Sequence, residues 1–268
     1  MAKPFEPDSN FKIIWEFFLS IFIFYQLVYL PLQMTFDLPD SDFMIAIDLI
    51  QTVYFIADIF VNFHTAYTAD GILILDHKRI AIHYLKTWFI IDFISSVPFD
   101  LLLAKENHTL NQSLRALVLL RALRLIRILR VFRARRILAT VKEMLGFSYG
   151  LSGLFRLLKL SFVILLFSHW SACLWYYVSL NSYENNRPSW IEKFDFVQAT
   201  WDERYVASLY WAIASMLTVG YGDLTAASKQ EQLYNIFAIL IGCGIFGYIM
   251  NQIGDIIQQI NSEVSYRE

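Results

Sequence analysis

The chain has 268 residues, of which 57% are hydrophobic and 17% aromatic, and its formal net charge is -2. Soluble domains average about 45–50% apolar residues, so this composition excludes an ordinary soluble domain and favours a membrane protein. The two cysteines, Cys173 and Cys243, both lie in apolar segments and predict neither a disulfide framework nor a metal site.

Six apolar stretches are long enough to cross a bilayer, which requires about 20 helical residues. They cover residues 11–33, 43–67, 84–104, 113–133, 157–180 and 230–257. An amphipathic run at 205–217 precedes the last stretch and predicts a re-entrant helix. We therefore expect an all-α membrane protein with six transmembrane helices and a re-entrant loop.

Basic residues predict the orientation, because Lys and Arg in short loops mark the cytoplasmic side. They flank the connection between the second and third stretches and follow the fourth stretch. The connection between the first and second stretches carries acids and no basic residue. The basic residues are Lys78, Arg79, Lys86, Arg133, Arg135, Arg136 and Lys142, and the acids are Asp37, Asp40 and Asp42. Because residues 1–10 also lack the apolar core of a signal peptide, both termini are expected in the cytoplasm.

The first stretch is rich in Phe, Ile and Tyr, and its polar exceptions are Ser20 and Gln26. We expect it to face lipid and to pack the bundle, and we assign it no chemistry.

Acidic residues interrupt the second and third stretches. Asp48 and Asp58 lie in the second and Asp92 in the third, where an unpaired carboxylate costs several kcal/mol. Each is therefore a candidate functional residue, and Asp58 shares a helix face with Phe55. The orientation places Asp58 and Asp92 at similar depth in the inner half of the bilayer. The alternative is that these acids are structural caps or face water.

Arginines recur at multiples of three in the fourth stretch, with one interruption at Val118. The series is Arg115, Arg121, Arg124, Arg127, Arg130, Arg133 and Arg136. Arginine stays charged at physiological pH, so each must find an acid or water. Such a helix is typical of a voltage sensor. The alternative is a basic amphipathic helix on a membrane surface or on nucleic acid, against which the acids of the preceding stretches argue. Arg115 is expected further out, near Asp48 or outer water.

The segment Thr218-Val219-Gly220-Tyr221-Gly222-Asp223 follows the re-entrant helix. Irregular backbone at membrane depth is tolerated where it lines a water-filled cavity or is buried in protein. Four such loops on one axis would present rings of carbonyl oxygens that replace the hydration shell of potassium. Gly220 and Gly222 permit the unusual dihedrals required. We predict a selectivity filter with permeating potassium at Thr218, Val219, Gly220 and Tyr221, and no other metal; the alternative is a simple glycine turn.

Three further patterns carry weaker predictions. Trp190 and Trp201 indicate an ordered outer loop with aromatic rings at the membrane interface. Gly242, Gly244 and Gly247 in the last stretch indicate either a gating hinge or close helix packing. Two sequons, at Asn107 and Asn111, lie in a short outer connection close to the membrane, which argues against their glycosylation.

Residues for enzyme chemistry are lacking. We find no paired catalytic carboxylates, nucleophile–base pair or metal cluster, and His64, His83 and His169 are isolated and expected to be structural. The sequence predicts a protein that is not an enzyme and needs no cofactor besides potassium ions.

Four runs together resemble the cyclic-nucleotide-binding-domain group of voltage-gated channels, which includes ether-a-go-go-like, pacemaker and cyclic-nucleotide-gated channels. They are DIFVNFHTAY at 58–67, YLKTWFIIDFISSVP at 84–98, HWSACLWYY at 169–177 and SLYWAIASMLTVGYGD at 208–223. The resemblance implies a homo- or heterotetramer in which each four-helix voltage sensor packs beside its own subunit's pore, without domain swapping. It also implies that Phe55, Asp58 and Asp92 form the centre through which the arginines pass, with Phe55 separating inner from outer water.

The resemblance implies a division into five parts: a cytoplasmic N-terminus (1–10), a voltage sensor (11–136), a coupler (137–156), a pore domain (157–260) and the start of a cytoplasmic region (261–268). Pacemaker and cyclic-nucleotide-gated channels have degraded filters, whereas this one is intact and predicts potassium selectivity. The group's linker and nucleotide-binding domain find no counterpart, so no cyclic-nucleotide site is assigned.

We therefore expect a voltage-gated potassium channel subunit that binds three further subunits and lipid, but no nucleic acid. It would lie in the plasma or ciliary membrane. The alternatives are a hyperpolarisation-activated or cyclic-nucleotide-modulated cation channel, a non-conducting regulatory subunit, and a membrane module of a larger protein with a C-terminal catalytic or nucleotide-binding domain. The sign of voltage gating does not follow from the sequence.

Overall fold

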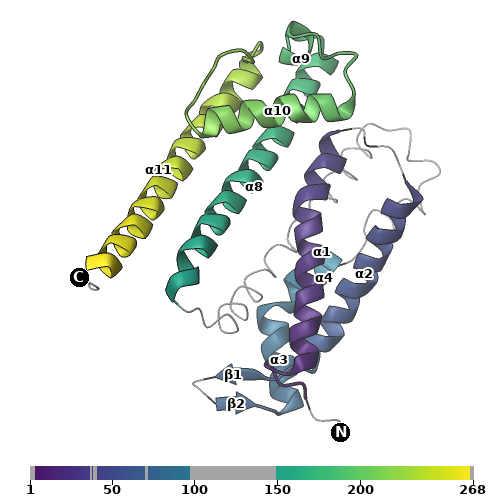
Figure 1. Ribbon diagram of the computed structural model, residues 1–268. Coiled ribbons are helices and arrows are strands. Elements are labelled where there is room, and N and C mark those ends of the chain that lie inside the picture. Colours follow the sequence, from purple (N-terminus) through teal and green to yellow (C-terminus); the bar gives the residue numbers. More distant parts are fainter. Residues whose placement is uncertain (1–3, 37, 39–40, 70–71, 97–148, 266–268) are drawn as a thin grey trace, which may run out of the picture. The chain divides into compact units, whose positions relative to one another are not determined.

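The computed structural model describes residues 4–36, 38, 41–69, 72–96 and 149–265 (Figure 1). The chain divides into two compact units: residues 1–27 with 39–146, and residues 28–38 with 147–268. Within the described part, four helices are long and apolar enough to cross a membrane: Asn10–Thr35, Asp42–Phe63, Leu160–Glu184 and Lys229–Gln258. They match the first, second, fifth and sixth predicted stretches. The fourth stretch and the sequons at Asn107 and Asn111 lie outside the described residues.

The first unit is built on α1 (Asn10–Thr35) and α2 (Asp42–Phe63). Aromatic contacts join the two helices: the Trp15 ring stacks on Tyr54 with centroids 4.2 Å apart, and Phe22 meets Tyr54 edge-on at 5.0 Å. Such pairs contribute about 0.5–1.5 kcal/mol beyond their buried area. This contact fixes which face of α1 turns toward α2.

A short hairpin and two helices follow α2. Strands β1 (Tyr67–Ala69) and β2 (Ile72–Ile74) pair antiparallel, and α3 (His77–Thr87) and α4 (Phe89–Ser96) come next. The prediction of helix to residue 67 and of one continuous stretch from 84 is wrong at these boundaries, since α2 ends at Phe63 and α3 gives way to α4 at Trp88. The hairpin was not predicted, because its strands have only three residues each.

The second unit contains α8 (Tyr149–Glu184), α9 (Trp190–Lys193), α10 (Trp201–Met216) and α11 (Lys229–Ser265). In Figure 1, α8 and α11 run side by side and α10 lies across their upper ends. With 16 residues α10 is too short to span a bilayer, which agrees with a re-entrant helix. Its first turn is closed by Glu203, whose carboxylate accepts a hydrogen bond from the Thr200 backbone N–H at 2.8 Å.

Three tryptophans form the centre of the second unit. Trp175 of α8 stacks on Trp190 at 4.5 Å and on Trp211 of α10 at 4.0 Å. The Trp190 side chain is fully buried (0% exposed), whereas Trp201 is 39% exposed, and a position of either ring at the membrane interface stays a prediction. The loop between α8 and α10 is also tied to α11 by Glu231, whose carboxylate accepts hydrogen bonds from the backbone N–H groups of Trp190 and Ala227. The side chains that pack against α10 are therefore largely aromatic.

Candidate functional site

In the backbone after α10, residues with a positive φ angle alternate with residues that lack one. Thr218, Gly220 and Gly222 have φ angles of 58°, 57° and 78°, whereas Val219 and Tyr221 between them are not in the positive-φ region. Glycine tolerates this conformation, but a β-branched residue there is a genuine outlier. Such strain costs about 1–3 kcal/mol and clusters at functional sites. The role of the two glycines follows from the sequence, but the positive φ of Thr218 does not.

Two hydrogen bonds orient the inner carbonyls of this segment. The backbone N–H groups of Val219 and Gly220 both donate to the carbonyl oxygen of Ala214 in α10, at 2.9 and 3.2 Å. In a planar trans peptide the C=O points opposite to the N–H of the same unit. The carbonyls of Thr218 and Val219 therefore both point away from α10, whereas successive carbonyls of a strand would alternate. A row of oxygens facing one way can coordinate a dehydrated cation.

The outer end of the segment is held by Asp223. The Tyr210 hydroxyl donates to Asp223 Oδ2 at 2.6 Å, and the Leu224 N–H donates to Oδ1 at 3.0 Å. The Tyr210 hydrogen bond is the main cause of a lowered pKa for Asp223. Tyr210 also stacks on Tyr221 with ring planes 3° apart. Tyr210 was not identified from the sequence, since it lies 13 residues before its partner.

The candidate hinge glycines differ in their surroundings. α11 is an unbroken helix through all of them. A Cβ at Gly242 would lie 3.1 Å from the Met216 Cα, whereas one at Gly244 or Gly247 would meet nothing within 4 Å. Gly242 thus permits close packing of α11 against the end of α10. A gating hinge stays a prediction.

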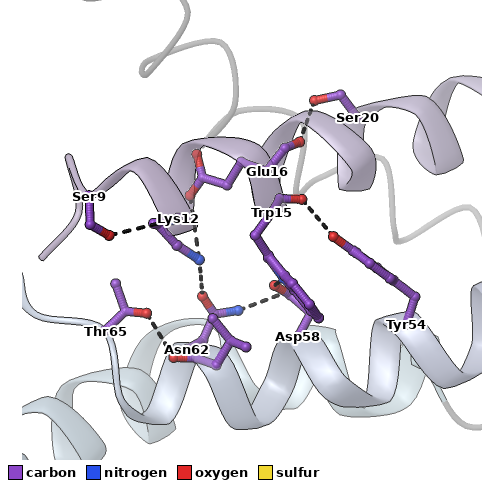
Figure 2. Close-up of polar contacts among 10 residues, drawn as sticks. Ser9, Lys12, Trp15, Glu16, Ser20, Tyr54, Asp58, Asn62 and Thr65 are labelled. Atoms are coloured by element: carbon purple, nitrogen blue, oxygen red, sulfur yellow. Dashed lines mark hydrogen bonds and ion pairs between the residues drawn. The ribbon is translucent and has the colours of Figure 1, made fainter. Parts of the chain in front are cut away.

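The first unit buries the predicted acid of α2. Asp58 is 1% exposed, and both carboxylate oxygens accept hydrogen bonds: Oδ1 from Trp15 Nε1 at 3.0 Å and Oδ2 from Asn62 Nδ2 at 2.9 Å (Figure 2). The side-chain Oδ1 of Asn62 in turn accepts a hydrogen bond from Lys12 Nζ at 3.0 Å, and Lys12 Nζ lies 3.5 Å from Glu16 Oε1. The first stretch, to which no chemistry was assigned, thus supplies polar partners to α2. Asn62 could have been found from its i+4 spacing, but Trp15 has no such signal.

The predicted acid of the third stretch is buried too. Asp92 of α4 is 0% exposed and accepts a hydrogen bond from the Tyr84 hydroxyl at 2.7 Å. The Ser96 hydroxyl donates to the Asp92 carbonyl at 2.6 Å and approaches the Phe55 carbonyl at 3.5 Å. Phe55 is 0% exposed, and the Ser96 hydroxyl links its backbone in α2 to the backbone of Asp92 in α4.

The remaining predicted sensor residues contribute less to the described geometry. Asp48 is half-buried, and its carbonyl accepts a hydrogen bond from the Thr52 hydroxyl at 2.8 Å. The gating-charge candidates Arg115, Arg121, Arg124, Arg127, Arg130 and Arg133 lie outside the described residues. Their pairing with the buried acids stays a prediction.

Helices long and apolar enough to cross a membrane, and between two of them a short helix followed by two carbonyls that point away from it, are consistent with a helical membrane channel. Comparison with protein families matches residues 12–265 to the family described as ion transport protein, and the chain belongs to this family.

Curated relatives of the chain include the voltage-gated inwardly rectifying potassium channel KCNH6 of Homo sapiens, which is 28% identical over 95% of this chain and 28% of its own length. The potassium voltage-gated channel unc-103 of Caenorhabditis elegans is 28% identical over 95% of this chain and 33% of its own length. The voltage-gated inwardly rectifying potassium channel KCNH2 of Cavia porcellus is 30% identical over 95% of this chain and 20% of its own length. The chain thus spans about a fifth to a third of the length of these relatives.

Proposed function

We propose that this chain is the membrane portion of a voltage-gated, potassium-selective channel subunit. The observation that carries the proposal is the direction of the Thr218 and Val219 carbonyls, which both point away from α10. Their supports, Gly220 and Gly222, have the φ angles that such a row requires. The relatives named above are voltage-gated potassium channels, which agrees with this function.

Exposed apolar groups favour a tetramer as the working unit. In the single chain, Val219 is 50% and Tyr221 70% exposed. Both belong to the filter segment, which can coordinate an ion only when several copies form a ring. Four copies, identical or mixed, would bury these side chains around a shared axis. Both termini would face the cytoplasm, in a plasma or ciliary membrane.

The voltage-sensing part of the proposal rests on the buried acids. Asp58 and Asp92 are held by Trp15, Asn62 and Tyr84, so the carboxylates are positioned before any arginine reaches them. The arginine series would then pass Phe55 in steps as the membrane potential changes. A hyperpolarisation-activated or nucleotide-modulated channel, or a module of a larger protein, would use the same sensor.

Voltage-clamp recording in potassium and sodium solutions tests the proposal. Reversal potentials are expected to follow the potassium gradient. Gly220→Ala should abolish selectivity or current, because alanine at a φ of 57° is strained whatever the surrounding space. Gly254→Ala is the matched control, since a Cβ there meets nothing within 4 Å and the residue lies within the helix α11. A wild-type channel that reverses near zero in mixed sodium and potassium would contradict potassium selectivity.

A further inference from the structure

The helix α3 is anchored on one side to the end of the apolar helix α2. The Tyr84 ring meets the ring of Phe63, the last residue of α2, edge-on with centroids 4.8 Å apart. The Tyr84 hydroxyl also donates a hydrogen bond to Asp92 of α4 at 2.7 Å. Ile80, one turn earlier in α3, is buried as well. These contacts fix which side of α3 faces the rest of the first unit.

This anchoring places α3 at the edge of the bilayer. The 22 residues of α2 make it about 33 Å long, so as a spanning helix it would cross the hydrocarbon core and end at its boundary with Phe63. The α4 helix returns along α2, where Ser96 approaches the Phe55 carbonyl at 3.5 Å. Figure 1 shows α3 and the hairpin at the same end of α1 and α2. A helix in this position meets both lipid headgroups and water.

The other side of α3 is exposed and combines apolar with basic side chains. Ile82 and Leu85 are 52% and 44% exposed and lie three residues apart, on one face of the helix. Three exposed basic residues are three or four positions from Ile82 and therefore surround it. They are Lys78, Arg79 and Lys86. An apolar centre with a basic rim is the pattern of a helix that lies in a membrane interface.

The net charge of this surface is positive, since α3 contains no acidic residue. Asp76, which precedes the helix, accepts a hydrogen bond from the Lys78 backbone N–H at 3.2 Å, and its Oδ2 lies 3.8 Å from Arg79 Nε. Both side chains of that ion pair are exposed, so the pair is weak and leaves the guanidinium able to bind a second anion. Three basic side chains therefore face one acid.

A bilayer interface supplies both partners that this surface needs, because it offers phosphate groups to the basic side chains and acyl chains to the apolar ones. By the predicted topology this end of α2 is cytoplasmic, and the cytoplasmic leaflet carries anionic lipids. We propose that Lys78, Arg79 and Lys86 bind the headgroup of an anionic phospholipid, with Ile82 and Leu85 in contact with its acyl chains. The inference goes beyond the proposed function, since it requires α2 to span the membrane but requires no ion conduction.

Native mass spectrometry of the protein in detergent tests the site with two lipids that share their acyl chains and a phosphate. Dioleoyl phosphatidylserine has a net negative charge, whereas dioleoyl phosphatidylcholine has none. The combined Lys78→Gln, Arg79→Gln and Lys86→Gln variant should lose at least about fivefold in affinity for phosphatidylserine, the value of one basic residue near an anionic surface. Its affinity for phosphatidylcholine should stay the same.

The matched control removes the same charge from three exposed residues of the second unit. It combines Arg187→Gln, Lys193→Gln and Lys229→Gln, and it should bind phosphatidylserine like the wild type. Ile82→Ala should weaken the binding of both lipids, because the contact with the acyl chains is reduced. An unchanged phosphatidylserine affinity in the α3 variant, or an equal loss in the control, would overturn the inference.

The competing occupant is an acidic segment of a protein, for which poly-glutamate is the probe. It should displace little phosphatidylserine, since it offers no apolar group to Ile82. If poly-glutamate displaces the lipid and Ile82→Ala leaves lipid binding unchanged, the surface binds acidic protein and the inference is overturned. Neither measurement depends on ionic current, so the lipid site and the proposed channel function can fail separately.

Discussion

Tyr210 and Asp223 join the re-entrant helix to the outer end of the filter segment. Their 2.6 Å hydrogen bond holds one end of the segment. The other end is held by the Ala214 carbonyl, which accepts hydrogen bonds from the backbone N–H groups of Val219 and Gly220. Both ends of a strained backbone are thus fixed to the same helix, α10. The strained φ angle of Thr218 can persist because hydrogen bonds on both sides of the residue fix the backbone.

Tyr210→Phe is expected to make the channel more sensitive to external acid. The Tyr210 hydroxyl lowers the pKa of Asp223, so the hydrogen-bonded carboxylate is present at neutral pH and is lost as pH falls through the lowered pKa. Without the hydroxyl the pKa returns toward its ordinary value, and protonation occurs at higher pH. Potassium current can be measured in planar bilayers between about pH 5 and about pH 3. As the pH is lowered, the current of the variant should decrease at a higher pH than that of the wild type.

Asp223→Asn should remove this difference, because no carboxyl remains to titrate. Tyr177→Phe, an exposed tyrosine of α8, should behave like the wild type. Identical acid curves for Tyr210→Phe and the wild type would show that the hydrogen bond does not support conduction.

The first helix, α1, has two different faces although its hydropathy is high throughout. Phe17 and Phe24 are 62% and 51% exposed, as expected for contact with lipid. The opposite side presents an indole N–H from Trp15 to the buried carboxylate of Asp58, and an amide from Gln26 to α2. Under the proposed function, α1 would orient the carboxylate of Asp58, and the arginine series of the fourth stretch would carry the gating charge.

This division of roles predicts separable effects on gating. Neutralising Arg124 or Arg127 should lower the limiting voltage slope by about a quarter to a third, if three to four charges cross the field in each subunit. Arg136→Gln, at the cytoplasmic end, should leave the slope nearly unchanged. Trp15→Phe keeps a ring beside Tyr54 but removes the donor to Asp58, so it should shift the midpoint and leave the slope intact.

Conductance–voltage curves of these variants provide the measurement. Unchanged slope and midpoint in both Arg124 and Arg127 variants would mean that the fourth stretch is a structural basic helix.

The two units divide the chain differently from the predicted domains. Residues 28–38 at the end of α1 belong with the second unit, where Phe36 stacks on Tyr176 at 4.2 Å and the His169 ring contacts the Val28 carbonyl at 2.9 Å. The end of α1, which was expected to belong to the voltage sensor at 11–136, thus packs with α8 through aromatic contacts.

The purified protein is expected to be a tetramer, because the filter segment coordinates an ion only as a ring. Light scattering in detergent, corrected for the bound detergent, should give about four times the 31.4 kDa of one chain. Gly254→Ala should assemble in the same way, since a Cβ there meets nothing within 4 Å in the chain. A monomer or dimer that still conducts potassium would contradict the proposal that four filter segments form a ring.

The sequence by itself determined four of the apolar helices, the two glycines that have positive φ, and the positions of two acids that are buried. Hydropathy over about 20 residues, the cost of a carboxylate in a bilayer and the conformational freedom of glycine are local properties that one chain segment carries. Asp58 and Asp92, which the sequence marked as candidate functional residues, are both buried, and their role stays a prediction.

Only the tertiary structure decided which partners these residues have. Trp15 lies 43 residues from Asp58, and Trp190 is buried because α9 folds back onto α8, so neither contact leaves a periodic signal. The positive φ of Thr218 and the approach of Gly242 to Met216 depend on how α10 and α11 pack. Side-chain pairing across helices is set by three-dimensional proximity, which hydropathy and spacing along one segment do not encode.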